Sequence, residues 1–477
     1  MMAQLISQAS PFQTLPMMNL LEKSFNNVSD NDKVWFMASN PLTSGAFILI
    51  SGKFGDLYGL KLVFNIGICW CSLWSLLVGL SSYTHSVIFF CICRAMQGIG
   101  LALILSNAIG IAGNLYPNGQ RKAIVFCLIA AFAPIGAALG TLFGGLTAQF
   151  GVWQWSFYST AILLFLMAVI SHFVIPYVEP LHKSPNMDWW GAITGVCGLI
   201  LLSFAWNQAP EAGWSSPYII VILILGLISL AVFFYIEKWI ASSPLLPNEI
   251  MNFNLLMVLS ITALGWGSFS VWTYYYWSFI LNLKHFNPLI SGTTYVTFLV
   301  FGVIACLVVS LLIKRVQPSY LLLAAMICFV VGLTMLSVTP VNQSYFKMLF
   351  PQIILLSFGV DMSFPAALII LSDSLPKKHQ GMSSSLVTTM VNYEMSIALG
   401  IASSAEVEIK TKTGELLKAY RAALYVGIGL AAISVIFSVV FVVSSKIWPI
   451  DTTEDEHFDD FKSKVNIDAK NYNDGAV

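Results

Sequence analysis

The sequence predicts an all-α polytopic membrane protein, and its composition is the first observation behind this prediction. Hydrophobic residues make up 57% and charged residues only 10% of the 477-residue chain, and its mean hydropathy is +0.79. Soluble domains carry about 25% charged residues, so the composition excludes an ordinary water-soluble fold. The formal net charge of zero gives no reason to expect a nucleic-acid partner.

The second observation is the recurrence of apolar runs along the chain. A helix needs about 20 apolar residues to cross a bilayer. We identify fourteen such runs, at residues 3–21, 34–51, 61–80, 86–115, 122–149, 154–176, 189–206, 217–237, 254–281, 288–313, 319–338, 346–371, 382–404 and 421–444. The first run is the weakest because it contains Pro11, Pro16 and three glutamines. Two interpretations are open: the start of this span is missing, or residues 1–21 form a partial or interfacial segment.

Basic residues predict the orientation of these spans. If the loop at residues 52–61 is cytosolic, most other basic loops fall on the same side, with Arg121, Lys122, Lys183, Lys238, Lys314, Arg315, Lys377 and Lys378. This agrees with the positive-inside tendency and predicts that both termini are cytosolic. The sequons at Asn27 and Asn342 then lie on outer loops. The acidic tail, residues 445–477, is expected to be cytosolic and disordered because it has charge and little apolar content.

A short glycine-rich loop separates the second and third runs, with the sequence Gly-Lys-Phe-Gly-Asp-Leu-Tyr-Gly-Leu-Lys at residues 52–61. A tight turn between buried helices favours glycine, which reaches positive φ at no steric cost. We therefore expect Gly52, Gly55 and Gly59 to form the turn. Asp56 and Lys61 are charges that cannot enter hydrocarbon, so they are expected to hold the turn at the water interface.

Two further motifs lie inside the fourth and fifth runs. The fourth run contains Arg94-Ala-Met-Gln-Gly-Ile-Gly, in which Gln97 lies one turn after Arg94 and shares its helix face. The fifth run contains Pro134, which removes a backbone hydrogen bond and favours a kink. It also carries a stripe of small residues that lets another helix approach closely, formed by Gly136, Gly140 and Gly144.

The 52–61 loop and these two motifs, in this order, resemble the major facilitator superfamily of secondary transporters. Fourteen runs instead of twelve resemble its fourteen-helix drug:proton antiporter branch. Four stretches look like the fungal aminotriazole-resistance permeases, whose relatives are linked to boron export and ammonium transport: Asn207-Gln208-Ala209-Pro210, Leu245-Leu246-Pro247, Gly265-Trp266-Gly267-Ser268-Phe269 and Ser363-Phe364-Pro365-Ala366.

The resemblance implies two six-helix bundles that rock about a midplane cavity. The bundles would be residues 1–176 and 253–444, with two inserted helices in the linker 177–252. Asp56 and Lys61 would then act as gate elements between the cytosolic ends of the bundles, with simple interface anchoring as the alternative. The glycine stripe would be part of the moving interface if it lies between the bundles.

Arg94 is a candidate for substrate or proton coupling, because a charge in mid-span is expensive and normally faces protein or water. A structural ion pair, or bonds to helix carbonyls, is the alternative. Antiporters of the branch usually carry an aspartate in helix 1, and the matching position here is Ser7. Proton coupling must therefore use another residue or be absent.

Two carboxylates inside later spans are the candidates for that role. Asp361 lies in the twelfth run, the pseudo-symmetric partner of the fourth, and Glu394 lies in the thirteenth. A desolvated carboxylate can load and release a proton near physiological pH. The alternatives are a hydrogen-bonded aspartate near the outer interface and a glutamate packed against polar neighbours.

An aromatic face in the ninth run is a candidate substrate contact. Trp272, Tyr275, Tyr276 and Phe279 follow i, i+3, i+4, i+7 spacing and share one helix face. Aromatic faces bind flat or cationic molecules, and Trp272 and Tyr276 are the better cavity candidates. The alternative is an aromatic belt at the outer interface.

The sequence favours a secondary active transporter that exports small solutes or drugs in exchange for protons. A facilitator or uptake permease for a small solute such as ammonium is one alternative, and a transporter-like sensor that does not turn over is another. No nucleotide-binding loop or catalytic motif occurs, so an enzyme, a metal site and a cofactor are not expected. The expected partners are a small molecule, protons and lipid, the expected state is a monomer, and the expected location is the plasma membrane, with the vacuolar membrane as the alternative.

Overall fold

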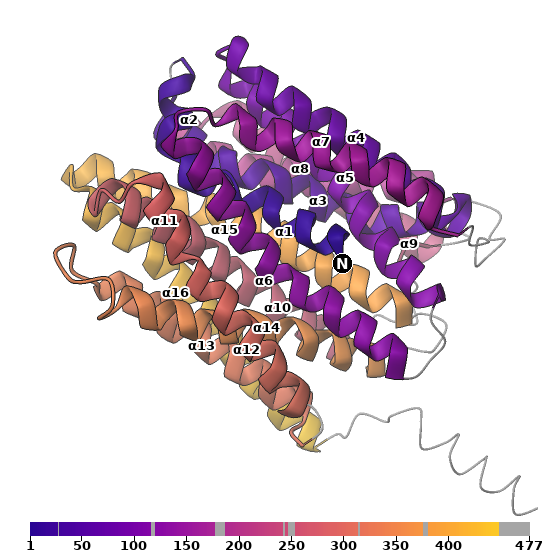
Figure 1. Cartoon of the computed structure of the whole chain (residues 1–477). Helices are drawn as coiled ribbons and strands as arrows, with labels where there is room; N and C mark the ends of the chain where they lie inside the picture. Colours follow the sequence, from indigo (N-terminus) through magenta and orange to yellow (C-terminus); the bar gives the residue numbers. More distant parts are fainter. Residues whose placement is uncertain are drawn as a thin grey trace, which may run out of the picture.

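The computed structural model describes residues 1–26, 28–115, 120–176, 187–241, 244–246, 253–312, 315–374 and 380–447. Every regular element in these residues is a helix, and the helices lie side by side along a common direction (Figure 1). Within these residues, twelve helical segments are long and apolar enough to cross a membrane. The predicted all-α membrane fold is therefore confirmed. The tail from residue 448 onward, Asn27, and the basic residues Lys183, Lys314, Lys377 and Lys378 lie outside the described residues.

The N-terminal half begins with a broken segment. Helices α1 (Met2–Phe12) and α2 (Met18–Ser24) are separated by the 3-10 turn η1 (Leu15–Met17). Pro16 cannot donate a backbone hydrogen bond, which explains the break. The remaining helices of this half are α3 (Asp30–Tyr58), α4 (Leu60–Leu80), α5 (Val87–Leu115), α6 (Gln120–Gln149) and α7 (Gln154–Val174), with the 3-10 turn η2 (Ser81–Tyr83) after α4.

The C-terminal half contains the other long helices. They are α10 (Phe253–Ser278), continued by the π-helical turn η4 (Phe279–Leu283), α11 (Pro288–Thr294), α12 (Val296–Leu312), α13 (Pro318–Val338), α14 (Leu349–Ser374), α15 (Gln380–Thr413) and α16 (Leu416–Ile447). All fourteen predicted runs have a helical counterpart, but the α1–α2 segment and α15 are not among the twelve apolar spans. A count of fourteen membrane-crossing helices therefore stays a prediction.

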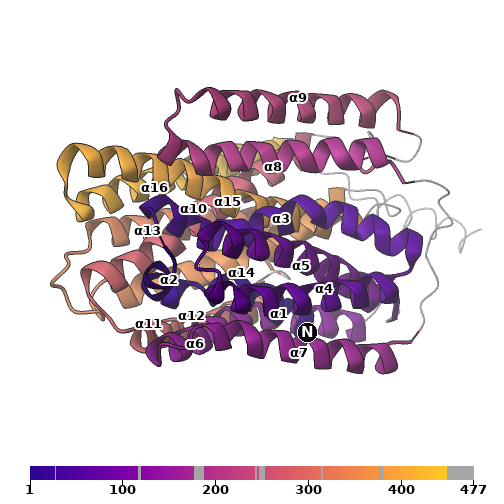
Figure 2. The same ribbon diagram turned by 90° about the horizontal axis from the view of Figure 1, so that it is seen from above.

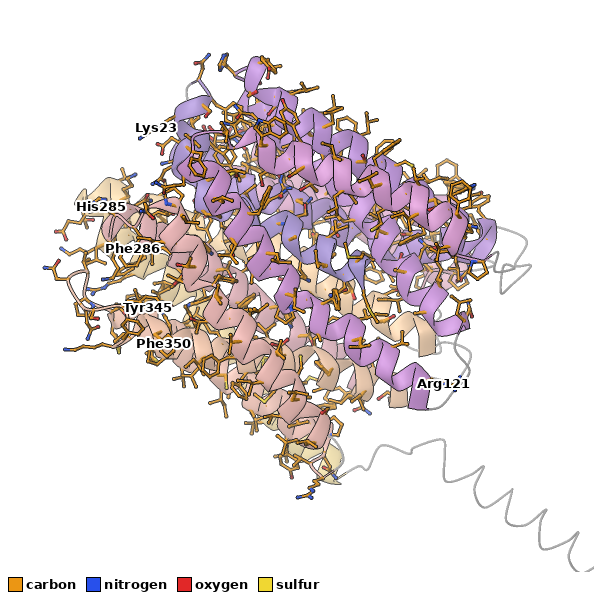
Figure 3. All side chains as sticks on the ribbon, viewed as in Figure 1. Lys23, Arg121, His285, Phe286, Tyr345 and Phe350 are labelled. Atoms are coloured by element: carbon orange, nitrogen blue, oxygen red, sulfur yellow. The ribbon has the colours of Figure 1, made fainter. Side chains whose placement is uncertain are left out.

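The inserted helices lie on one side of the molecule. Helix α8 (Trp189–Ala212) packs against α3 and α15, and α9 (Pro217–Trp239) covers the outer face of α8 (Figure 2). The two halves also meet where α3 contacts α15 and where α6 contacts α11 and α12. Arg121 lies at the opposite end of the molecule from Lys23 and His285 (Figure 3). This agrees with the prediction that Arg121 faces a different side of the membrane from the outer loops.

The predicted loop at residues 52–61 is mostly helical, which corrects the sequence analysis. Helix α3 continues to Tyr58 and α4 starts at Leu60, so the turn is Gly59 alone, with φ of 99°. Gly52 and Gly55 are helical and do not supply positive φ. Gly55 is needed for a different reason, because a Cβ there would collide with the side chain of Asn107 on α5.

Candidate transport site

A small cavity lies where the two halves meet. Its volume is about 40 Å³, which is room for a small number of water molecules. The N-terminal half contributes lining residues from α1 and α6, and the C-terminal half contributes them from α10, α12, α14 and α15: Gln8, Phe12, Ala133, Pro134, Ala137, Trp266, Phe269, Phe298, Val360, Asp361 and Met395. A cavity with walls from both halves is the place where a rocking transporter binds its substrate.

Asp361 is the one charged residue in this lining. Its side chain is 8% exposed, and among the described residues Oδ2 has no hydrogen-bond donor. A Cβ added to Gly302 of α12 would lie 2.8 Å from that oxygen and 3.0 Å from Pro134 of α6. The Cys306 thiol, one turn further along α12, is a hydrogen-bond partner of the same carboxyl group. The predicted Asp361 and Pro134 are thus brought together across the junction of the two halves.

Aromatic rings form much of the remaining wall. The Trp266 ring lies 5.7 Å from Phe269, and Phe269 lies 6.0 Å from Phe298. Trp266 Nε1 donates to Ser363 Oγ at 3.1 Å, which fixes the indole. These rings were not among the site residues predicted from the sequence, although Trp266 and Phe269 belong to a stretch that resembles the fungal permeases. The position of Trp266 between Gly265 and Gly267 was the signal that could have indicated a close helix junction.

The predicted Trp272 and Tyr276 are buried but do not line the cavity. They continue the stack outward from Phe269, with ring distances of 5.8 Å from Phe269 to Trp272 and 5.0 Å from Trp272 to Tyr276. Trp272 Nε1 donates to Gln352 Oε1 at 3.3 Å, and Tyr276 donates to Thr294 Oγ1 at 2.8 Å. Both side chains therefore lie in the interior of the C-terminal half.

Glu394 lies beside the cavity without lining it. It precedes the lining residue Met395 on α15 and is partly buried. A Cβ added to Gly267 of α10 would lie 3.9 Å from the Glu394 Cβ. This places Glu394 at the α10–α15 contact, adjacent to the position of Trp266.

Arg94 lies inside the N-terminal half with neutral partners. Its guanidinium donates to Ser10 Oγ at 3.1 Å, to the Ser10 carbonyl at 2.8 Å and to Gln97 Oε1. Gln97 in turn donates to Ser75 Oγ at 2.7 Å. The side chains of Arg94 and Gln97 are fully buried. Among the described residues, the ion pairs found do not include Arg94.

Helix α1 stands between Arg94 and the cavity. Gln8 and Phe12 line the cavity and are one turn apart, so they share a face of α1. Ser10 is two residues from each, about 200° around a helix with 3.6 residues per turn, and it receives the Arg94 guanidinium on the opposite face. Arg94 therefore does not line the cavity, and its role in substrate or proton coupling stays a prediction.

The predicted glycine stripe packs inside the N-terminal half. A Cβ added to Gly136 or Gly140 would collide with the backbone carbonyl oxygen of Leu5 or Ala9 on α1, and one added to Gly144 would collide with that of Gln13, directly after α1. The stripe is therefore not the interface between the two halves. That interface uses neighbouring glycines, because a Cβ on Gly145 would lie 2.6 Å from the Pro288 carbonyl oxygen, and one on Gly292 would lie 2.8 Å from the Thr141 carbonyl oxygen.

The predicted gate residues lie at one end of the helices, away from the cavity. Asp56 belongs to the last turn of α3 and Lys61 to the first turn of α4, on either side of Gly59. Both side chains are partly buried. Gly52 approaches α15, since a Cβ there would lie 3.6 Å from Ser385 Oγ.

Two helical halves, joined around a buried cavity with a carboxyl group, define a multi-pass membrane transport protein. The model of the Major Facilitator Superfamily matches residues 1–401. The chain belongs to the major facilitator superfamily, as the sequence motifs predicted. A crystal structure of the peptide transporter POT in complex with sulfate has the same fold, with a TM-score of 0.64, 13% identity and 93% of each chain covered. At that identity, the likeness shows the fold alone.

Curated fungal proteins are much more similar to this chain. The aminotriazole resistance protein of Saccharomyces cerevisiae is 47% identical, covering 94% of this chain and 83% of the relative. The low affinity ammonium transporter of the same yeast is 40% identical, and the match covers 94% of this chain and 87% of that transporter. The efflux pump terJ of Aspergillus terreus is 36% identical, and the match covers 92% of this chain and 86% of that pump. The predicted resemblance to fungal aminotriazole-resistance permeases is confirmed.

Proposed function

We propose that this protein exports small solutes or drugs across a membrane in exchange for protons, by alternating access. Membership of the major facilitator superfamily supports transport. The names of two relatives, a resistance protein and an efflux pump, support export. The observation that carries the proposal is the buried Asp361 carboxyl group in a cavity walled by both halves.

Contacts between the two halves next to the cavity suggest which contacts must break during transport. At the end predicted to face outward, Phe12 of α1 contacts Tyr295 with a ring distance of 5.5 Å. The close approach of Gly145 to Pro288 and of Gly292 to Thr141 joins α6 to α11 in the same region. Rocking of the halves would separate these contacts and open the cavity outward.

Asp361 is the preferred proton site and Glu394 the second candidate. An ionised carboxylate is poorly solvated in an apolar cavity, so binding a proton offsets that desolvation when no other positive charge is present. Because Asp361 lies at the junction of the halves, its proton would be exposed to one side and then the other as they rock.

We further propose a monomer in the plasma membrane, with transport and not catalysis as its activity.

The test is flux in sealed vesicles with an imposed pH gradient, using a panel of small solutes. Asp361→Asn keeps size and polarity but cannot bind and release a proton, so flux should no longer follow the pH gradient. Glu394→Gln is the matched comparison. If only Glu394→Gln uncouples flux, the proton site moves to α15. If neither variant alters the pH dependence, carboxylate coupling is wrong.

An uptake permease is the second candidate, and the low affinity ammonium transporter among the relatives favours it. Reversing the pH gradient in the same vesicles separates the two functions. Export by exchange requires solute and protons to move in opposite directions. An uptake permease would move solute down its own gradient, or together with protons.

A further inference from the structure

Glu237 is a buried carboxylate outside the cavity, in the last turn of α9, and its side chain is 4% exposed. Its Oε1 accepts a hydrogen bond from the backbone N–H of Leu245 at 3.2 Å. Its Oε2 accepts a second one from the backbone N–H of Leu246 at 2.9 Å. Hydrogen bonds to a charged acceptor are stronger than neutral ones. One side chain therefore fixes the backbone of a segment that follows α9.

The two leucines of this segment, which we call the leucine pair, lie at a contact between the two halves. Leu245 and Leu246 pack into an apolar cluster with Ala46 and Ile50 of α3. The inserted helices α8 and α9 complete the cluster with Ala192, Val196 and Phe233. Helix α8 is hydrogen bonded to α15 of the C-terminal half, whereas α3 belongs to the N-terminal half. The leucine pair thus packs between elements of different halves.

The charges at this contact also come from both halves. Asp188 caps the N-terminus of α8, where its Oδ1 accepts a hydrogen bond from the backbone N–H of Gly191 at 3.0 Å. A Cβ on Gly191 would lie 2.9 Å from Glu237 Oε1 and would collide with Asp188 Oδ2, so the two carboxyl groups lie close together. The Lys53 ammonium group of α3 attracts Glu237. Because adjacent carboxylates repel each other, the presence of Lys53 stabilises them.

Toward the same end of the molecule, α3 also meets α15 of the C-terminal half. A Cβ on Gly52 would lie 3.6 Å from Ser385 Oγ, and Gly52 precedes Lys53 in α3. This end is the one predicted to face the cytosol. Opening of the cytosolic side requires α3 to separate from α15. The same movement would take α3 away from the leucine pair and Lys53 away from Glu237.

We propose that Glu237 is a positioning residue for alternating access, because it holds the leucine pair against α3 and so stabilises the closed cytosolic side. This inference rests on the alternating access of the proposed function and adds a contact outside the cavity. Opening would expose apolar surface of the leucine pair and remove a cation from the two carboxylates. Both changes cost free energy. The contact therefore shifts the equilibrium between the two states toward the closed side.

Thiol reactivity of the purified protein tests this equilibrium without any flux measurement. In a cysteine-free background, Ser385→Cys reports on the cytosolic junction, because Ser385 lies near Gly52. Ser291→Cys reports on the outer junction, because Ser291 is fully buried beside Gly292. We expect Glu237→Ala to raise the maleimide reaction rate of Ser385→Cys at least about fivefold. The Ser291→Cys rate should stay low.

Glu237→Gln should give a smaller increase, because an amide keeps one acceptor oxygen but turns a donor toward the second N–H. Glu211→Ala is the matched control on the inserted helices, since this exposed carboxylate lies at the opposite end of α8 from Asp188. It should leave both rates unchanged. If Glu237→Ala does not fold, Leu246→Ala tests the same contact, because it shortens the leucine pair and keeps the carboxylate. It should also raise only the Ser385→Cys rate.

Three results would overturn the inference. One is an unchanged Ser385→Cys rate in Glu237→Ala and in Leu246→Ala. The second is an equal rise of the Ser291→Cys rate, which would indicate a general loosening of the fold. The third is an equal rise in Glu211→Ala.

Failure of the proposed function would look different. A selective rise of the cytosolic rate without pH-driven flux would leave the role of Glu237 standing and remove proton exchange. Proton-driven export with unchanged reaction rates in the Glu237 variants would keep the proposed function and reject the role of this residue.

Discussion

Arg94 is a positive charge whose described hydrogen-bond partners are all neutral. Its bonds to Ser10 join α5 to the short helix α1, which forms one wall of the cavity. We therefore interpret Arg94 as a residue that positions α1. The alternative of bonds to helix carbonyls, left open by the sequence, describes its geometry best.

Arg94→Ala should abolish transport and lower stability by about 1–3 kcal/mol, because the Ser10 carbonyl and the Gln97 amide lose a buried partner. Arg94→Lys should retain only part of the transport activity and part of the stability, since lysine lacks the planar five-donor group. Flux and the unfolding temperature in detergent measure the two effects. Full transport by the alanine variant would remove Arg94 from the mechanism.

Gly140 shows why a small residue is required in the middle of α6. A Cβ there would lie 2.5 Å from the Ala9 carbonyl oxygen of α1, and backbone cannot move as a side-chain tip can. Gly140→Ala should therefore destabilise the protein by about 1–3 kcal/mol through overpacking. Gly429→Ala in α16 is the control, because nothing lies within 4 Å of its added Cβ. An unfolding temperature unchanged in both variants would contradict this close contact.

At the scale of elements, the inserted helix α8 is bound more strongly to α15 than to α3. Ser203 and Ser396 share a hydrogen bond of 2.9 Å, Asn207 donates to the Ser396 carbonyl at 3.1 Å, and Tyr393 donates to the Leu199 carbonyl at 2.8 Å. The contact between α8 and α3 is mainly apolar. Trp35 Nε1 of α3 donates a hydrogen bond of 3.3 Å to Gln208 Oε1 of α8. Directional buried bonds resist sliding, whereas apolar packing permits it.

We accordingly expect α8 and α9 to move with the C-terminal half. In a cysteine-free background, a disulfide between Ser203→Cys and Ser396→Cys should leave transport intact. A bifunctional thiol cross-link between Trp35→Cys and Gln208→Cys should block transport until it is cleaved. Flux before and after reduction or cleavage measures both effects. The opposite pattern would assign the inserted pair to the N-terminal half.

At the scale of the whole molecule, the number of membrane crossings fixes where the termini lie. In the part of the chain that the structure describes, twelve helical segments have the length and hydropathy of a membrane span. The α1–α2 segment is interrupted at Pro16, and α15 carries many polar residues, yet both pack among the long helices. If both cross the membrane, the count is fourteen and the termini share a side.

The expected outcome is that tags on both termini stay inaccessible on intact cells and become accessible after permeabilisation. An even number of crossings would place both termini on one side of the membrane, and the basic loops predict that this side is the cytosol. A tag engineered into the 340–344 loop, next to the sequon at Asn342, is the control and should be accessible without permeabilisation. A C-terminal tag accessible on intact cells would reject the fourteen-span count.

The sequence by itself determined the membrane class, the position of the helices and the family. These depend on local properties, because about 20 consecutive apolar residues specify a spanning helix whatever their neighbours are. The order of the glycine-rich segment, the Arg94 motif and the α6 glycines was sufficient to predict the superfamily. The local pattern wrongly predicted Gly52 and Gly55 to be turn residues. In a sequence, a glycine required for contact with another helix cannot be distinguished from one required for a turn.

Only the tertiary structure decided which polar groups meet. Asp361 was a candidate from its residue type, but its position opposite Pro134 and among Trp266, Phe269 and Phe298 arises from helices far apart in sequence. Arg94 was separated from the cavity by the packing of α1, which no periodicity in α5 could reveal. The physical reason is that nearly every span is apolar, so the helix faces that pair are selected by shape and by a few hydrogen bonds between distant residues.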